Sequence, residues 1–145
     1  GSSGITRRWQ TDYFVNLIKK INTISKFHFY LLAGQNEKKQ AYEIMSKITK
    51  INITSLCNLS IYNSFKYIKN SKIYVGTDSA FMHLSAALNV KSFGLFGDTP
   101  VNYSDYSKNI FPIIPENFTT ISHQSNAMKL IKPDFVFKII KQQLL

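Results

Sequence analysis

The sequence contains a single cysteine, Cys57, among 145 residues. One cysteine cannot form an internal disulfide or a CxxC metal site, which argues against a disulfide-stapled scaffold and against a structural zinc ribbon. No apolar run approaches the roughly 18 residues that a membrane-spanning helix needs, and the N-terminus lacks the apolar core of a signal peptide. A soluble chain, compatible with a reducing compartment, is therefore expected.

Several common catalytic motifs are also missing. The sequence has no GxGxxG, GxxxxGK[ST], GxSxG or HExxH. These patterns mark dinucleotide sites, P-loops, α/β-hydrolase nucleophiles and zinc proteases respectively, so none of those signatures supports a function here.

Acidic residues are scarce: 8 Asp and Glu stand against 18 Lys and Arg, a formal net charge of +10. A basic surface attracts phosphates, which keeps a non-enzymatic α/β module that binds RNA or acidic partners as one alternative. The lysines are spread along the chain, in pairs at most, as in Lys19-Lys20 and Lys38-Lys39. Such spacing is more typical of solvated faces than of a binding patch.

Apolar residues make up 44% of the chain, enough for a packed core. Short apolar runs alternate with segments of helical period, a pattern typical of a parallel α/β sheet flanked by helices. The expected strands are 27–33, 51–56, 72–75 and 91–96, with a weaker fifth at 110–114, and the expected helices are 11–24, 37–48, 62–69, 79–88 and one from Pro133 onward. Residues 1–145 then form one domain, in which Gly1–Gly4 is either a remnant of an expression tag or a native turn.

The most informative segment runs from Lys72 to Pro100, KIYVGTDSAFMHLSAALNVKSFGLFGDTP. It predicts a strand, a turn and a helix whose N-cap is supplied by Asp78 and Ser79, and ligands of α/β sheets bind at this carboxyl edge. A helix start offers unpaired N–H groups and a partial positive charge, which suit an anion. His83, four residues after Ser79, shares its face and can reach a group docked there. The alternative is that Asp78 only caps the helix and His83 is a satisfied, half-buried histidine.

Two further groups could carry chemistry. Arg7-Arg8-Trp9 precedes the first expected helix, and arginine matches phosphate oxygens bidentately, although a tryptophan at this place is more often a packing anchor. Glu37 follows the first expected strand and the turn at Gly34. Its carboxylate could accept two hydroxyl hydrogen bonds from a sugar, or could simply be a first-turn helix carboxylate.

Taken together, these residues resemble the C-terminal domain of glycosyltransferase family 9, the bacterial heptosyltransferase family. GSSGITRRWQ looks like the family's glycine-serine turn and basic-tryptophan stretch, and LLAGQNEKKQA looks like its strand, glycine turn and Glu-bearing helix start. TDSAFMHLSAALNV is similar to the family's Asp-Ser/Thr-Gly-x-x-His-Leu signature, and KLIKPDFVFKIIKQQL is similar to its closing helix. The resemblance spans nearly the whole chain, and the segment Asp78–Leu88 is its specific part.

The resemblance implies one half of a GT-B enzyme, a Rossmann-like domain that holds a nucleotide-sugar donor. The implied activity is inverting transfer of heptose from ADP-heptose to a lipid-linked oligosaccharide acceptor of lipopolysaccharide core, without cofactor or metal. Carried over by position, the donor-binding residues are Arg7, Glu37, Asp78, Ser79, Ala80 and His83. It further implies a cytoplasmic location with peripheral contact at the inner face of the inner membrane, and no nucleic-acid partner.

The sequence departs from the family pattern at two places near these residues. Ala80 stands where the family has glycine, and Gln10 replaces the proline after Trp9. These changes leave open a transferase of another nucleotide-hexose in surface polysaccharide synthesis. In the family the catalytic base lies in the N-terminal domain, so the catalytic residue is unknown from this chain, which we expect to bind nucleotide without catalysing transfer.

Overall fold

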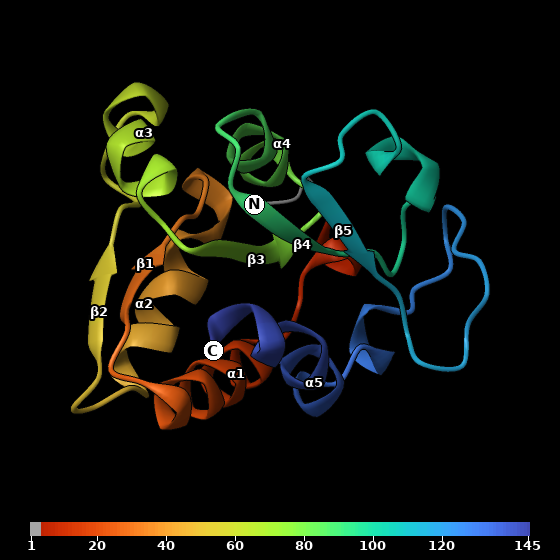
Figure 1. Cartoon of the computed structure of the whole chain (residues 1–145). Coiled ribbons are helices and arrows are strands. Elements are labelled where there is room, and N and C mark those ends of the chain that lie inside the picture. Colours follow the sequence, from red (N-terminus) through yellow and green to blue (C-terminus); the bar gives the residue numbers. More distant parts are fainter. Residues whose placement is uncertain (1–3) are drawn as a thin grey trace.

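The computed structural model describes residues 4–145 and shows an α/β fold with two groups of parallel strands (Figure 1). In the first group, β1 (His28–Leu31) pairs with β2 (Asn52–Ser55). In the second group, β4 (Lys91–Leu95) lies between β3 (Ile73–Thr77) and β5 (Ile110–Ile113). All three pairings are parallel, which confirms the fold class predicted from the sequence.

Helices cover both faces of the strands. The helices are α1 (Thr11–Ile24), α2 (Lys38–Ser46), α3 (Ile61–Lys69), α4 (Ala80–Ala87) and α5 (Pro133–Leu144), with short 3-10 turns η1 (Ile5–Arg7), η2 (Gln35–Glu37), η3 (Val101–Ser104) and η4 (Met128–Leu130). Figure 1 shows α3 and α4 on one side, and α1 beside α5 on the other. Among residues 4–145, no helix combines the length and the apolar character needed to cross a membrane.

The main core lies between α1, α5 and the strands of the second group. The apolar stripe of α1 is buried at Leu17 and Ile21, and α5 contributes Val136 and Ile140. Pro133 occupies the first turn of α5, where its missing N–H costs nothing, as the sequence predicts. Trp9 is the largest fully buried side chain and joins this core just before α1 begins. The interpretation of Trp9 as a packing anchor is therefore confirmed.

The elements differ from the sequence-based expectations mainly at their ends. The strand expected over 27–33 is shorter, and the strand expected over 72–75 extends to Thr77. The helix expected from Glu37 begins one residue later, because residues 35–37 form a 3-10 turn first. The expected turn at Gly34 is present, since the Gly34 carbonyl accepts the amide of Glu37 at 3.1 Å, and its backbone is extended with φ −71°. Of the segment Gly1–Gly4, only Gly4 lies within the described residues.

Candidate functional site

The residues singled out by the sequence gather where β3 ends and α4 begins. Ser79 occupies the N-cap of α4 with extended backbone angles, φ −160° and ψ 167°, and Ala80 is exposed. The amides of Met82 and His83 both bond to the Ser79 carbonyl, at 3.0 and 3.3 Å. The N–H groups of Ala80 and Phe81 have no acceptor among the described residues, as the geometry of a helix start requires. The start of α4 is therefore open to an external acceptor.

The side chains around this helix start form a chain of three polar groups. His83 Nε2 lies 3.2 Å from Asp78 Oδ1, and His83 Nδ1 is hydrogen-bonded to the hydroxyl of Tyr106. An ionised carboxylate only accepts hydrogen bonds, so Nε2 donates to Asp78 while Nδ1 accepts from Tyr106. The imidazole is thereby fixed in one tautomer and one orientation, and its side chain remains 38% exposed.

Neither Asp78 nor Ser79 caps α4 with its side chain, which corrects the sequence-based expectation. The Asp78 carboxylate binds His83 instead of a backbone amide. The Ser79 hydroxyl lies 3.5 Å from the hydroxyl of Tyr74. Burial raises the pKa of Tyr74 to about 12, so this hydroxyl keeps its proton at physiological pH. Two first-turn amides consequently remain unoccupied by the protein's own side chains.

Tyr106 is a member of this site that the sequence analysis missed. It lies 23 residues after His83, in the loop that follows η3. Partial desolvation of its hydroxyl, and then the negative charge of Asp78, raise the pKa of Tyr106. No motif marks this tyrosine, because its meeting with His83 depends on how the loop before β5 folds back over α4.

Arg8, rather than Arg7, forms the ion pair of the N-terminal basic stretch. An Arg8 guanidinium nitrogen lies 3.6 Å from Glu37 Oε1, and Glu37 is 9% exposed. Arg8 Nε is buried without a hydrogen-bond partner among the described residues. Arg7 is half-buried and forms no ion pair within residues 4–145. Glu37 therefore keeps one carboxylate oxygen, Oε2, without a protein partner within residues 4–145, and Gly34 leaves room for that oxygen.

Two cavities border these residues. A basin of about 680 Å³ lies beside η1 and is lined by Thr6, Arg8, Gln40 and Asn126 among others. A second cavity of about 550 Å³ lies between β1 and β3 and is lined by Arg8, Glu37 and Thr77 at its polar end. The group of Asp78, Ser79, Ala80 and His83 lines neither cavity; Ala80 is exposed, Asp78 and His83 are half-buried, and Ser79 is buried. The structure thus brings the α4 residues together, and separately pairs Arg8 with Glu37.

The sequence profile of glycosyltransferase family 9, described as heptosyltransferase, matches residues 1–132. The chain belongs to this family. Lipooligosaccharide heptosyltransferase 2 of Campylobacter jejuni serotype O:2 is 31% identical over 104 residues, which is 68% of this chain and 31% of that protein. The protein of the same name from serotype O:6 is 25% identical over 97% of this chain and 48% of its own length.

The fold of this family 9 chain is also similar to solved structures. An E. coli ADP-heptose lps heptosyltransferase II matches with a TM-score of 0.83 and 21% identity, over 99% of this chain and 44% of that one. The E. coli heptosyltransferase WaaC with ADP matches with a TM-score of 0.79 and 17% identity, over 99% of this chain and 42% of that one. The chain therefore spans between 31% and 48% of the length of the relatives described here.

Asp98 is a second residue of this family 9 chain that the sequence did not predict. It connects the N-terminal stretch to the loop after β4. It is 8% exposed. Its carboxylate accepts the Asn126 amide at 2.9 Å and the Thr6 hydroxyl at 2.8 Å. The hydrogen bond from Asn126, with further help from Thr6 and the nearby charge of Arg7, holds the pKa of Asp98 below its ordinary value of 3.8. Arg7 is thus placed near this carboxylate.

Asp98→Asn is expected to lower the free energy of unfolding by about 1–2 kcal/mol at neutral pH, because the charge-assisted hydrogen bonds weaken. A carboxyl whose pKa is lower in the folded state stabilises the protein above its unfolded-state pKa, and this contribution is lost as the pH falls through the folded-state pKa. The difference between the two proteins should therefore shrink below about pH 4. Urea denaturation from pH 7 to pH 2.5 measures it, with the exposed Asp105→Asn as control. A difference that stays constant over this range would contradict the prediction.

Proposed function

We propose that this chain is the donor-binding half of an inverting glycosyltransferase that uses ADP-heptose or a related nucleotide sugar to extend lipopolysaccharide core. Membership of glycosyltransferase family 9 supports the reaction class. The single observation that carries the donor site is the His83 imidazole, held by Asp78 beside the open first turn of α4.

The start of α4 suits a diphosphate on physical grounds. Ala80 and Phe81 offer unpaired N–H groups there, and the helix dipole adds about half a positive charge. His83 lies one helical turn after Ser79, and side chains of a helix point back toward its start. To contact a phosphate oxygen, His83 Nδ1 exchanges the hydroxyl of Tyr106 for the donor and donates instead of accepting. In this proposal Asp78 is the positioning residue and His83 touches the donor.

The second part of the proposed donor site is formed by Arg7, Arg8 and Glu37, near the carboxyl ends of the strands. Arg7 forms no ion pair within residues 4–145, so its guanidinium is available to phosphate oxygens. Glu37, oriented by Arg8, offers its second carboxylate oxygen to the hydroxyl groups of a ribose. This division assigns diphosphate contacts to Arg7 and a hydroxyl contact to Glu37.

The proposed transfer is a single displacement at the anomeric carbon. An acceptor hydroxyl oxygen forms a bond to that carbon as its bond to the diphosphate oxygen breaks, and the hydroxyl proton passes to a base. Negative charge grows on the departing diphosphate, where helix N–H groups and cationic side chains stabilise the transition state more than the ground state. The base is expected in the other half of the enzyme. A lipid-linked acceptor would place the reaction at a membrane surface, which a net charge of +10 favours.

Isothermal titration calorimetry with ADP tests the donor site. The chain should bind ADP, and Asp78→Ala and His83→Ala should each weaken binding about 10–100-fold, the loss expected when a hydrogen bond to a charged group is removed. His28→Ala is the matched control, because His28 is exposed and hydrogen-bonded to Thr54 on the other strand group. Equal, negligible heats for the parent and both α4 variants would contradict the proposal.

A further inference from the structure

The helix α3 presents large apolar side chains to solvent. Ile61 is 57% exposed and Tyr62 is 79% exposed, and the half-buried ring of Phe65 lies 5.8 Å from that of Tyr62, measured between ring centroids. Single exposed apolar residues are ordinary, whereas three that meet on one helix form a patch. None of the three lines either cavity described above, so the patch is the outer surface of a helix and not a groove.

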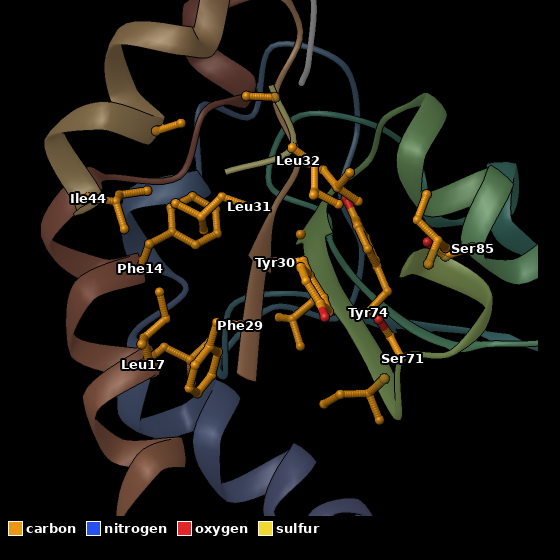
Figure 2. A pocket seen from close by; sticks show the side chains of 18 of the residues that line it. Phe14, Leu17, Phe29, Tyr30, Leu31, Leu32, Ile44, Ser71, Tyr74 and Ser85 are labelled. Atoms are coloured by element: carbon orange, nitrogen blue, oxygen red, sulfur yellow. The ribbon is translucent and has the colours of Figure 1, made fainter. Parts of the chain in front are cut away.

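The opposite side of α3 holds this helix in the fold. Ser64 and Ile68 are its buried residues, and the ring of Tyr67 lies 5.1 Å from that of Tyr30. Figure 2 shows Tyr30 between β1 and β3. The Ser60 side chain caps the helix by accepting a backbone amide of the first turn at 3.1 Å. The exposed patch therefore contributes little to holding α3 in place.

The patch lies in a stretch of sequence that has no negative charge. No Asp or Glu occurs between Glu43 and Asp78, whereas that stretch contains five lysines: Lys47, Lys50, Lys66, Lys69 and Lys72. Lys66 and Lys69 are exposed in the last turn of α3, and neither forms an ion pair within residues 4–145. They follow Tyr62 at steps of four and three residues, so the three side chains share one face of the helix. This face combines apolar rings with uncompensated positive charge.

Such a combination is typical of a surface that lies on an anionic bilayer. Tyrosine rings are enriched at the level of the lipid headgroups, where the ring is in an apolar environment and the hydroxyl is in water. Lysine stems cover apolar surface there while the ammonium groups reach anionic headgroups. Single-stranded RNA is instead bound in a positively charged groove. The outer face of α3 is not a groove, and it therefore fits a lipid surface better.

The position of α3 suits this role. Figure 1 shows α3 at a corner of the fold beyond β2, on the opposite side of the strands from α1 and α5. Its start follows the carboxyl end of β2, just as the start of α4 follows the carboxyl end of β3. The patch and the proposed donor site therefore both lie at strand carboxyl ends, where ligands of α/β sheets bind.

We propose that the outer face of α3 docks on an anionic lipid bilayer through Ile61, Tyr62, Phe65, Lys66 and Lys69. The proposal rests on the proposed function, in which the acceptor is lipid-linked and the reaction takes place at a membrane surface. Each lysine contributes about fivefold to the affinity through its attraction to anionic headgroups. The apolar side chains enter the headgroup region and make the contact peripheral and reversible.

Co-sedimentation of the full-length protein with lipid vesicles tests this surface. Vesicles of phosphatidylcholine with about 30% phosphatidylglycerol should bind the protein at least about 10-fold more tightly than pure phosphatidylcholine. The double variant Lys66→Gln, Lys69→Gln should bind the anionic vesicles about 25-fold more weakly than the parent. The double variant Lys138→Gln, Lys141→Gln is the matched control. It removes the same charge at the same spacing from exposed positions of α5, and its affinity should stay within about twofold of the parent.

Tyr62→Trp reports on the apolar part of the contact without changing the charge. Its tryptophan emission should shift to shorter wavelength when anionic vesicles are added, because the ring leaves water. Ile139→Trp, at an exposed position of α5, is the control and should show no shift.

Equal vesicle binding by the parent and the α3 lysine variant, or unshifted emission from Tyr62→Trp, would overturn the proposal. RNA binding that depends on the α3 lysines without vesicle binding would also overturn it, as would self-association through Tyr62 that leaves vesicles unbound. These readouts require no nucleotide. Vesicle binding without ADP binding therefore contradicts the donor site alone, and ADP binding without vesicle binding contradicts the α3 surface alone.

Discussion

Trp9→Ala is expected to lower the free energy of unfolding by about 3–5 kcal/mol, the range found for removal of a buried aromatic ring. Trp9 is 1% exposed. Its ring meets Tyr13 and Phe14 edge-on, with centroid distances of 5.6 and 4.8 Å. Its indole N–H also donates to the Ile131 carbonyl at 2.8 Å. Domains of this size have total stabilities of about 5–15 kcal/mol, so the loss should be plain in urea denaturation.

Trp9→Phe separates the ring from the hydrogen bond. It keeps most of the apolar area but leaves the Ile131 carbonyl without its donor, so we expect a smaller loss of about 1–3 kcal/mol. Trp9 also follows Arg8 directly in the chain, so loosening it should weaken the Arg8–Glu37 pair. An unfolding midpoint for Trp9→Ala equal to that of the parent would contradict the assignment of Trp9 as the anchor of this stretch.

The sequence predicted the helices better than the sheet. The bounds of α1 agree with those expected, because its apolar stripe and polar flanks are local features. The strands were found, but their assembly into two separate groups was not. β1 and β3 lie more than 40 positions apart in the sequence, and no local pattern encodes whether two such distant strands pair.

The sequence predicted several residues of the candidate site but did not predict which residues they contact. Asp78 and His83 do lie together, in a direct contact between their side chains that the sequence did not predict. Tyr106 and Asp98 were missed because loops far along the chain bring them to this edge. The ion pair between Arg8 and Glu37 was not predicted from the sequence. Arg7 and Arg8 are neighbours, and the backbone at η1 decides in which direction each side chain points. The amino-acid composition does not encode that direction.

His83→Ala in the full-length enzyme is expected to lower kcat/KM for transfer by about 100–1,000-fold, the usual cost of removing one preorganised donor from a developing negative charge. The expectation rests on the proposed donor site, in which His83 faces the departing diphosphate. Since that charge is greatest in the transition state, kcat should fall more than KM rises. Steady-state kinetics with ADP-heptose and a lipopolysaccharide-core acceptor measure both.

Variants of the two partners of His83 show whether position or charge decides the effect. Asp78→Asn keeps an acceptor for Nε2 but removes the negative charge, and Tyr106→Phe keeps the ring contact but removes the hydroxyl that bonds to Nδ1. If Asp78 holds the imidazole for the diphosphate, Asp78→Asn should cost less than His83→Ala, and adding it to His83→Ala should cost almost nothing more. Tyr106→Phe should have the smallest effect, because the diphosphate displaces that hydroxyl from His83. A fully active His83→Ala enzyme beside an equally active His28→Ala control would remove His83 from the chemistry.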